Sequence, residues 1–198
     1  MRRLLGAVHL RACGGGGVIL EPVAPYRPSH FRVKFATSAW ERRACAALRR
    51  QVFCAEQGIF ADDDRDAIDA HAIPICALST LGGDADAVVG TVRIHEVAER
   101  PGEWWGSRLA VASAFRRTAA LGAGLIQVAV SSAHARGCTR FRAHVQERNV
   151  PLFQALHWAS LDAVDLHGRS HHLMQADLAA YPPMHDPEHG LVTFRKAA

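Results

Sequence analysis

The stretch VASAFRRTAALGAGLIQVAV, residues 111–130, places two arginines and two glycines where an amphipathic helix begins. One interpretation is a loop in which Arg116 and Arg117 are solvated while Gly122 and Gly124 provide flexibility. The other is an anion-binding turn, because the unpaired N–H groups and the dipole at a helix N-terminus both favour a phosphate. The stretch alone does not decide between them, so the surrounding sequence must.

Length, composition and charge favour one globular domain with a small anionic ligand. The chain has 198 residues, 49% hydrophobic and 21% charged, and a formal net charge of +4. These values are ordinary for a folded domain with a sizeable core. The arginines occur as scattered pairs and form no basic stripe, which argues against nucleic acid and favours a small anion. No apolar run is long enough to span a membrane.

The five cysteines are an odd number and include no CxxC motif, so neither a disulfide framework nor a zinc knuckle is indicated. Reduced thiols predict a cytoplasmic protein. The opening MRRLLGAVHLRAC resembles a secretory signal, but His9 and Arg11 interrupt a short apolar run, so export is not expected.

Hydrophobic periodicity predicts the order strand, helix, three strands, helix, strand, helix, two strands. The expected strands are 31–36, 73–80, 86–97, 104–111, 138–146, 159–166 and 171–178, with a short one at 18–20. The expected helices are one that Ser38 caps, one over 117–136 and one over 150–157 that Asn149 caps. Hairpins join the three middle strands, which excludes a doubly wound dinucleotide fold and predicts an α+β domain on a mostly antiparallel sheet.

Within this order, the opening stretch resembles the pyrophosphate loop of the GNAT N-acetyltransferase superfamily, Gln/Arg-x-x-Gly-x-Gly/Ala. Arg117, Ala120 and Gly122 fill the three positions, with alanine in place of the first glycine. Three further stretches resemble one GNAT branch: LRRQVFCAEQGIFADDDRDAIDAHA, VQERNVPLFQALHW and HGRSHHLMQADL. The combination is most similar to N-acetyltransferases of bacterial nitrogen-starvation gene clusters.

The resemblance implies a GNAT fold, in which a mixed, mostly antiparallel sheet splays open between strands 104–111 and 138–146 and carries helices on both faces. It implies a GNAT domain over residues 31–180, a flexible N-terminal extension over 1–30 and a C-terminal tail over 181–198. The implied partners are acetyl-CoA, as cosubstrate, and a small amine acceptor; a homodimer stays open.

The resemblance also implies which residues bind acetyl-CoA. Leu109 and Val111 would bond the pantetheine arm through their main chains, and Asn149 would contact it further along, or merely cap its helix. Phe153 stands where many relatives carry a tyrosine that protonates the departing thiolate. The expected pyrophosphate loop and helix start comprise Arg117, Thr118, Ala119, Ala120, Leu121, Gly122, Ala123 and Gly124.

The acceptor site is expected around the acidic loop 58–72 and the strand that follows Glu103. Glu56 either shapes this site with Gln57 or pairs with a neighbouring arginine, Arg49 or Arg50. Asp66 either binds a cationic acceptor or, with Asp69, caps the segment that follows. Of Trp104 and Trp105, which alternate along a strand, one is expected in the core and Trp105 at the acceptor. The acidic loop lacks the glycine and terminal glutamate of a calcium loop, so no metal is expected.

The expected reaction is direct attack of a neutral amine on the thioester, with a backbone N–H near Leu109 polarising its carbonyl. His95, Glu96 and Glu103 are the candidate general bases, although each also has an ordinary structural explanation. Cys54 is interpreted as a buried residue of the first helix and not as a nucleophile. The alternatives are an acyl-homoserine-lactone-synthase-like acyltransferase and a catalytically silent acyl-CoA-binding module.

Overall fold

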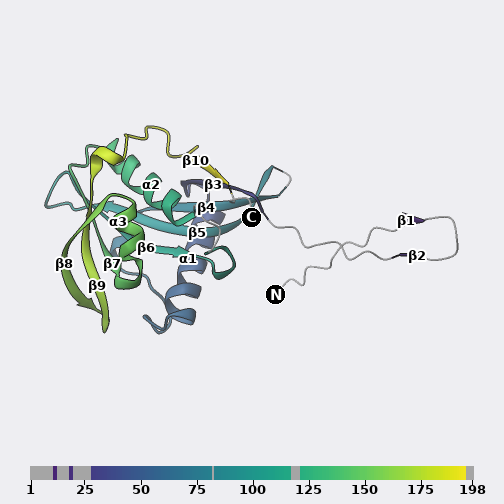
Figure 1. Ribbon diagram of the computed structural model, residues 1–198, viewed down its shortest axis with the longest axis horizontal. Helices are drawn as coiled ribbons and strands as arrows, with labels where there is room; N and C mark the ends of the chain where they lie inside the picture. Colours follow the sequence, from purple (N-terminus) through teal and green to yellow (C-terminus); the bar gives the residue numbers. More distant parts are fainter. Residues whose placement is uncertain (1–10, 13–17, 20–27, 82, 117–120, 195–198) are drawn as a thin grey trace.

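A computed structural model describes residues 11–12, 18–19, 28–81, 83–116 and 121–194. Eight strands form one sheet in the order β10-β3-β4-β5-β6-β7-β9-β8 (Figure 1). They are β3 (His30–Phe35), β4 (Ile73–Leu81), β5 (Asp84–Glu96), β6 (Glu103–Val111), β7 (Arg140–Gln146), β8 (Trp158–Leu166), β9 (Arg169–Ala176) and β10 (Leu191–Phe194). Among the described strands, β6 and β7 are the one parallel pair, which confirms the predicted mostly antiparallel α+β fold.

In the described part of the chain, three α-helices pack on this sheet: α1 (Ala39–Arg50), α2 (Leu121–His134) and α3 (Val150–Ala155). The Ser38 side chain accepts from the Glu41 N–H and Glu41 returns a bond to the Ser38 N–H, so the predicted cap is a full capping box. A π-helical segment (Gln51–Glu56) continues α1. The helix predicted over 117–136 begins at Leu121 in the described residues, and 117–120 lie outside them.

Strand alternation assigns the helices to opposite faces of the sheet. Along β4, Ile75 and Ala77 belong to the main core with α2, whereas Cys76 and Leu78 pack with Cys45 of α1. Figure 1 shows α1 and α2 on the two sides of the strands. The expected arrangement of helices on both faces is therefore confirmed.

The segment expected to be a C-terminal tail contains part of the sheet, so that expectation is wrong for residues up to 194. β10 pairs antiparallel with β3, and Tyr181 is buried in the main core. Gly190 precedes β10 with φ +66, and a Cβ there would lie 1.9 Å from the Val33 carbonyl oxygen. Only glycine fits this close approach, which aligns β10 with its neighbour.

At the N-terminus, β1 (Arg11–Ala12) and β2 (Val18–Ile19) form a separate two-stranded pair. The second strand matches two of the three residues expected at 18–20. The main sheet begins at His30, one residue before the predicted strand. The remaining residues of the expected extension lie outside the described part of the chain.

The sheet opens between β6 and β7. Their pairing covers residues 103–105 against 140–142, while both strands continue beyond it, to Val111 and Gln146. Just past the paired part, the register with β5 shifts between Thr91 and Arg93, and Arg108 adopts φ 56. This bulge bends β6 away from β7. The predicted central splay is confirmed, and it determines where the site lies.

Candidate active site

A cavity of about 470 Å³ occupies the splay between β6 and β7. Ile126 and Ala129 of α2 line it from one face of the sheet, while Phe60 and Ile68 of the acidic loop line it from the other. The cavity is therefore reached by side chains from both faces. Such a passage can bring two ligands together from opposite sides.

The expected pantetheine residues lie at this opening, with one exception. Leu109, Asn149 and Phe153 line the cavity, whereas Val111 is not among its lining residues and its carbonyl accepts from Nε of Arg116 at 2.9 Å. The expected cap at Asn149 is wrong in its detail. Asn149 stands at the N-cap position with helical backbone angles, and its side chain makes no capping bond.

The expected pyrophosphate loop is described only in part, because Arg117, Thr118, Ala119 and Ala120 lie outside the described residues. Gly122 is open, since a Cβ there would meet only Leu152 at 3.9 Å. Gly124 instead faces the sheet, where a Cβ would approach Val33 to 3.3 Å, and Leu121 is buried in the core. The side-chain positions of 121 and 124 thus serve packing, so a contact with the cosubstrate there would be made by the main chain and stays a prediction; Ala123 is half-buried.

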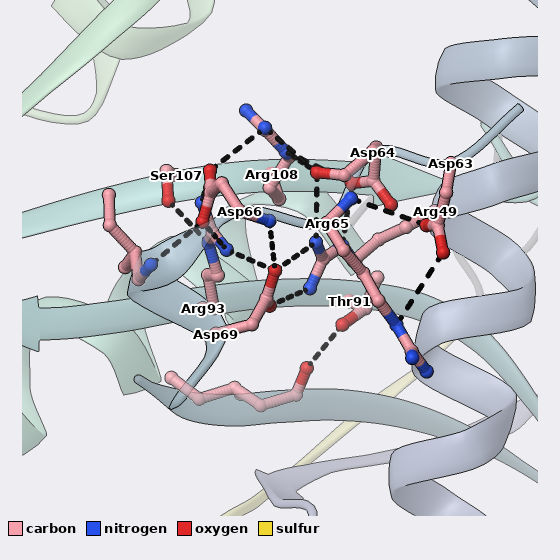
Figure 2. Close-up of polar contacts among 12 residues, drawn as sticks. Arg49, Asp63, Asp64, Arg65, Asp66, Asp69, Thr91, Arg93, Ser107 and Arg108 are labelled. Atoms are coloured by element: carbon pink, nitrogen blue, oxygen red, sulfur yellow. Dashed lines mark hydrogen bonds and ion pairs between the residues drawn. The ribbon is translucent and has the colours of Figure 1, made fainter. Parts of the chain in front are cut away.

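Three arginines and three aspartates form a network beside the acidic loop, here called the ion cluster (Figure 2). Its members are Arg49 of α1, Asp64, Asp66 and Asp69 of the acidic loop, Arg93 of β5 and Arg108 of β6. The contacts measure 2.6–3.1 Å, and the side chains of Arg93 and Asp64 are 2% and 1% exposed. Charges removed from water require such partners. The ion cluster therefore fixes the acidic loop to the sheet.

Asp66 lines the cavity but has little left to offer a cation. Its two carboxylate oxygens accept from Arg93 at 2.8 and 2.6 Å, and one accepts from Arg108 at 3.1 Å. The hydrogen bonds from Arg93 are the main reason that its pKa lies below the usual range. Asp66 also forms a capping box with Asp69 around the 3-10 helix Ala67–Ala70, which confirms the capping interpretation.

Glu56 and Gln57 follow α1, but only Gln57 lines the cavity. Glu56 pairs with Arg116, so the expected pairing with Arg49 or Arg50 is wrong, and Glu56 is not among the lining residues. Gln57 lines the cavity, and its side-chain oxygen accepts from Gln146 of β7 at 3.0 Å. This bond ties the end of the first helical segment to the splayed strand.

The three candidate bases separate clearly. Glu103 is buried beside Trp105, Arg100, Arg140 and Arg142 and does not line the cavity. Its pKa is lowered, chiefly by the hydrogen bond that it accepts from Trp105. Glu96 is exposed and accepts from the Gly102 N–H at 2.7 Å. These contacts give both carboxylates structural roles.

His95 does line the cavity, half-buried on β5. Its Nδ1 is buried and has no hydrogen-bond partner in the described part of the chain. Burial, with His71 and Arg93 nearby, lowers its pKa from the usual value and keeps the imidazole neutral near pH 7. Of the three candidates, His95 is the one placed to take a proton from a ligand in the cavity.

The aromatic pair follows the expected alternation. Trp104 is 5% exposed within the main core, and Trp105 lines the cavity with its ring 5.0 Å from that of His144. Phe153 also lines the cavity and packs edge-on against Trp158 at 5.0 Å. Cys54 is half-buried and is not a lining residue.

Arg93 and Arg108 were missed from the sequence as site residues. Arg93 carried a usable signal, because a charged residue inside the apolar run VVGTVRI must find partners when the strand is buried. Arg108 carried none, because its left-handed backbone arises from the bulge and its partners lie 42 and 44 residues away.

Comparison with known proteins agrees with this geometry. The model of the acetyltransferase (GNAT) family matches residues 39–158, so the chain belongs to the GNAT family. This family uses an acyl-CoA and an amine acceptor. A search of curated proteins found no significant match.

Solved structures share the fold. A Lactobacillus plantarum protein assigned as an N-acetyltransferase has 23% identity and a TM-score of 0.64, covering 74% of this chain and 97% of its own. Escherichia coli ElaA has 18% identity and a TM-score of 0.62, and the match covers 74% of this chain and 98% of ElaA. FeeM, an N-acyl amino acid synthase from uncultured soil microbes, has 12% identity and a TM-score of 0.60, and the match covers 77% of this chain and 93% of FeeM.

The described residues contain no group of three or more His, Cys, Asp or Glu side chains arranged to hold a metal ion. Within the same residues, no helix has the length and apolar character needed to cross a membrane.

Proposed function

We propose that the protein transfers an acyl group, acetyl in the first instance, from acyl-CoA to the amine of a small molecule. The observation that carries the proposal is the cavity in the splay, which side chains from both faces of the sheet line. The cosubstrate enters from the side of α2 and α3, past Asn149 and Phe153. The acceptor enters from the side of the acidic loop. The reaction takes place in the cytoplasm, where acyl-CoA is available.

In this proposal the bulge in β6 polarises the thioester. Beyond residue 105 the N–H groups of β6 are not paired with β7, and the bulge at Arg108 re-aims the strand beside Leu109. A preorganised N–H that points at the developing oxyanion stabilises the tetrahedral intermediate. The amine then attacks the carbonyl carbon, the C–S bond breaks, and the thiolate of CoA leaves.

His95 serves as the general base, directly or through one water molecule. Its lowered pKa keeps it unprotonated at neutral pH, and its imidazole forms part of the cavity wall. Phe153 has no proton to donate, so the thiolate leaves unassisted or is protonated by water. A thiolate is a weak enough base to depart in this way.

Thermal denaturation with and without acetyl-CoA tests the cosubstrate. Ligand at 100 times its dissociation constant should stabilise the native state by about 2.7 kcal/mol. Gly122→Trp should abolish this shift, because the position is open in the fold but lies in the expected phosphate loop. Gly122→Ala is the matched control and should retain it. An equal shift in the tryptophan variant would contradict the proposed binding mode.

Release of CoA with a panel of amines tests the chemistry. Amine-dependent release is expected. The silent-module alternative predicts stabilisation by acetyl-CoA with no more than slow thioester hydrolysis. The acyl-homoserine-lactone-synthase-like alternative predicts that release depends on S-adenosylmethionine.

A further inference from the structure

The charge of the cavity wall differs from what an acidic loop leads one to expect. The ion cluster contains as many guanidinium groups as carboxylates, so the three aspartates present no net negative charge. Asp66 is the one carboxylate among the described residues that line the cavity, and Arg93 and Arg108 engage both of its oxygens. A cationic ligand would have to displace these bonds. The lining also includes Arg148, so its charged groups have a positive excess.

Arg108 is the member of the ion cluster with a free donor. Its Nε and one terminal nitrogen bond Asp64 and Asp66, whereas its other terminal nitrogen has no partner in the described part of the chain. Figure 2 shows one terminal nitrogen of Arg108 directed away from the carboxylates. By contrast, Arg93 is fully engaged by Asp66, Asp69 and Ser107.

The surroundings of Arg108 favour an anion. Its guanidinium lies 4.6 Å from the ring centroid of Phe60, and its side chain is 18% exposed. Burial, with the adjacent Arg93, lowers its pKa, the direction expected of a cation with too little negative charge around it. A carboxylate is the planar group that a guanidinium binds best.

The same positive wall suits a nucleophilic amine. Nearby cations lower the pKa of an amine and raise its neutral fraction, and the neutral form is the one that attacks. His95 and Arg93 are two residues apart on the same face of β5, so their Cα atoms are roughly 7 Å apart along the strand. Arg108 shares the Asp66 carboxylate with Arg93. A molecule about the size of an amino acid spans this separation.

We propose that the acceptor is a small amine that also carries a carboxylate, and that Arg108 binds this carboxylate through its free terminal nitrogen. The amine then faces His95, and an apolar body lies against Phe60 and Trp105. This inference rests on the proposed acyl transfer and narrows its substrate class.

The test compares kcat/KM for amines matched in size, L-leucine with L-leucinamide and L-phenylalanine with L-phenylalaninamide, using acetyl-CoA and the full chain. The measured quantity is the ratio of carboxylate to amide form. Arg108→Gln should lower this ratio at least tenfold, and Arg108→Lys should recover part of it. Arg65→Gln is the matched control, because Arg65 lies on the acidic loop that Arg108 contacts but is exposed and pairs with Asp63. It should leave the ratio unchanged.

Comparing variants by this ratio cancels the different amine pKa values of acids and amides. A loss that is equal for both forms in Arg108→Gln would show that Arg108 only supports the loop, and would overturn the inference. If that variant does not fold, the substrate preference of the wild-type protein still tests the inference. Faster acetylation of diamines than of any carboxylate-bearing amine would overturn it. Absence of CoA release with every amine, and of any stabilisation by acetyl-CoA, would instead remove the proposed function itself.

Discussion

The two ends of β6 carry two groups of arginines and carboxylates that are built differently. At the splayed end, the contacts of the ion cluster measure 2.6–3.1 Å, and Arg49 and Arg93 are 8% and 2% exposed. At the paired end, Arg100, Arg140 and Arg142 lie 3.1–3.9 Å from Glu103, and Arg100 and Arg140 are 60% and 52% exposed. The latter group is here called the Glu103 group.

Depth below the surface decides what each group does. In the ion cluster water cannot replace a lost partner of Arg49, Arg93 or Asp64, because these side chains are buried. Their charges therefore depend on the rest of the cluster, which fixes the geometry of the acidic loop. In the Glu103 group water solvates two of the arginines and weakens each pair. Similar residue types therefore hold a cavity wall at one end and a local turn at the other.

The largest expected effect is on stability, from Arg49→Met. This change leaves Asp64, whose side chain is 1% exposed, with one fewer cation, and its Oδ1 already lacks a partner. Breaking a buried pair on one side costs about 3–5 kcal/mol. Urea denaturation measures the free energy of unfolding, and Arg43→Met, at an exposed site of the same helix, is the control. A loss below about 1 kcal/mol would show that the two groups do not differ in this way.

The next effect is on turnover and separates His95 from Glu103. His95→Ala should lower kcat about 100-fold, whereas Glu103→Gln should change it by less than about threefold. The base acts in its neutral form and its pKa is lowered, so the acid limb of kcat/KM should lie below pH 6.5 and disappear in His95→Ala. Steady-state rates across pH measure this. Loss of the limb in Glu103→Gln instead would place the base in the other group.

A third effect concerns how the free energy of unfolding falls at low pH. The pKa values of Asp66 and Asp69 lie below those of the unfolded chain, near 3.9, mainly through hydrogen bonds and charge from Arg93 and Arg49 that outweigh burial. Their contribution is therefore complete above that value and is lost as pH falls toward the lowered values. Unfolding free energies between pH 5 and pH 2 should fall less steeply for Arg49→Met than for the wild type. Parallel curves would contradict this linkage.

The sequence predicted the parts of this comparison that depend on local rules. The caps at Ser38 and at Asp66 with Asp69 follow from residue type and position, and the alternation of Trp104 and Trp105 correctly separated core from cavity. The element order predicted the mostly antiparallel sheet, whereas the splay was predicted from the resemblance, which implied which strands diverge.

What the sequence missed depends on contacts between distant residues. Glu103 was expected near the chemistry, but Trp105, two residues on, binds its carboxylate and arginines surround it. The role of Arg108 depends on a bulge, and β10 depends on the close approach at Gly190. None of these leaves a periodic pattern, since each requires knowing which strands lie side by side.

The smallest expected effect is that of Arg140→Gln in the Glu103 group. Arg140 is about half exposed, its nitrogen lies 3.6 Å from Glu103 Oε2, and Arg100 and Arg142 still face the carboxylate after the change. Exposed pairs contribute about 0–1 kcal/mol, so a loss within about 0.5 kcal/mol is expected. Urea denaturation at low and high salt measures it, and added salt should shrink even this difference. A loss of 2 kcal/mol or more, insensitive to salt, would show that Glu103 depends on Arg140 as Asp64 depends on Arg49, and the contrast between the two ends of β6 would no longer hold.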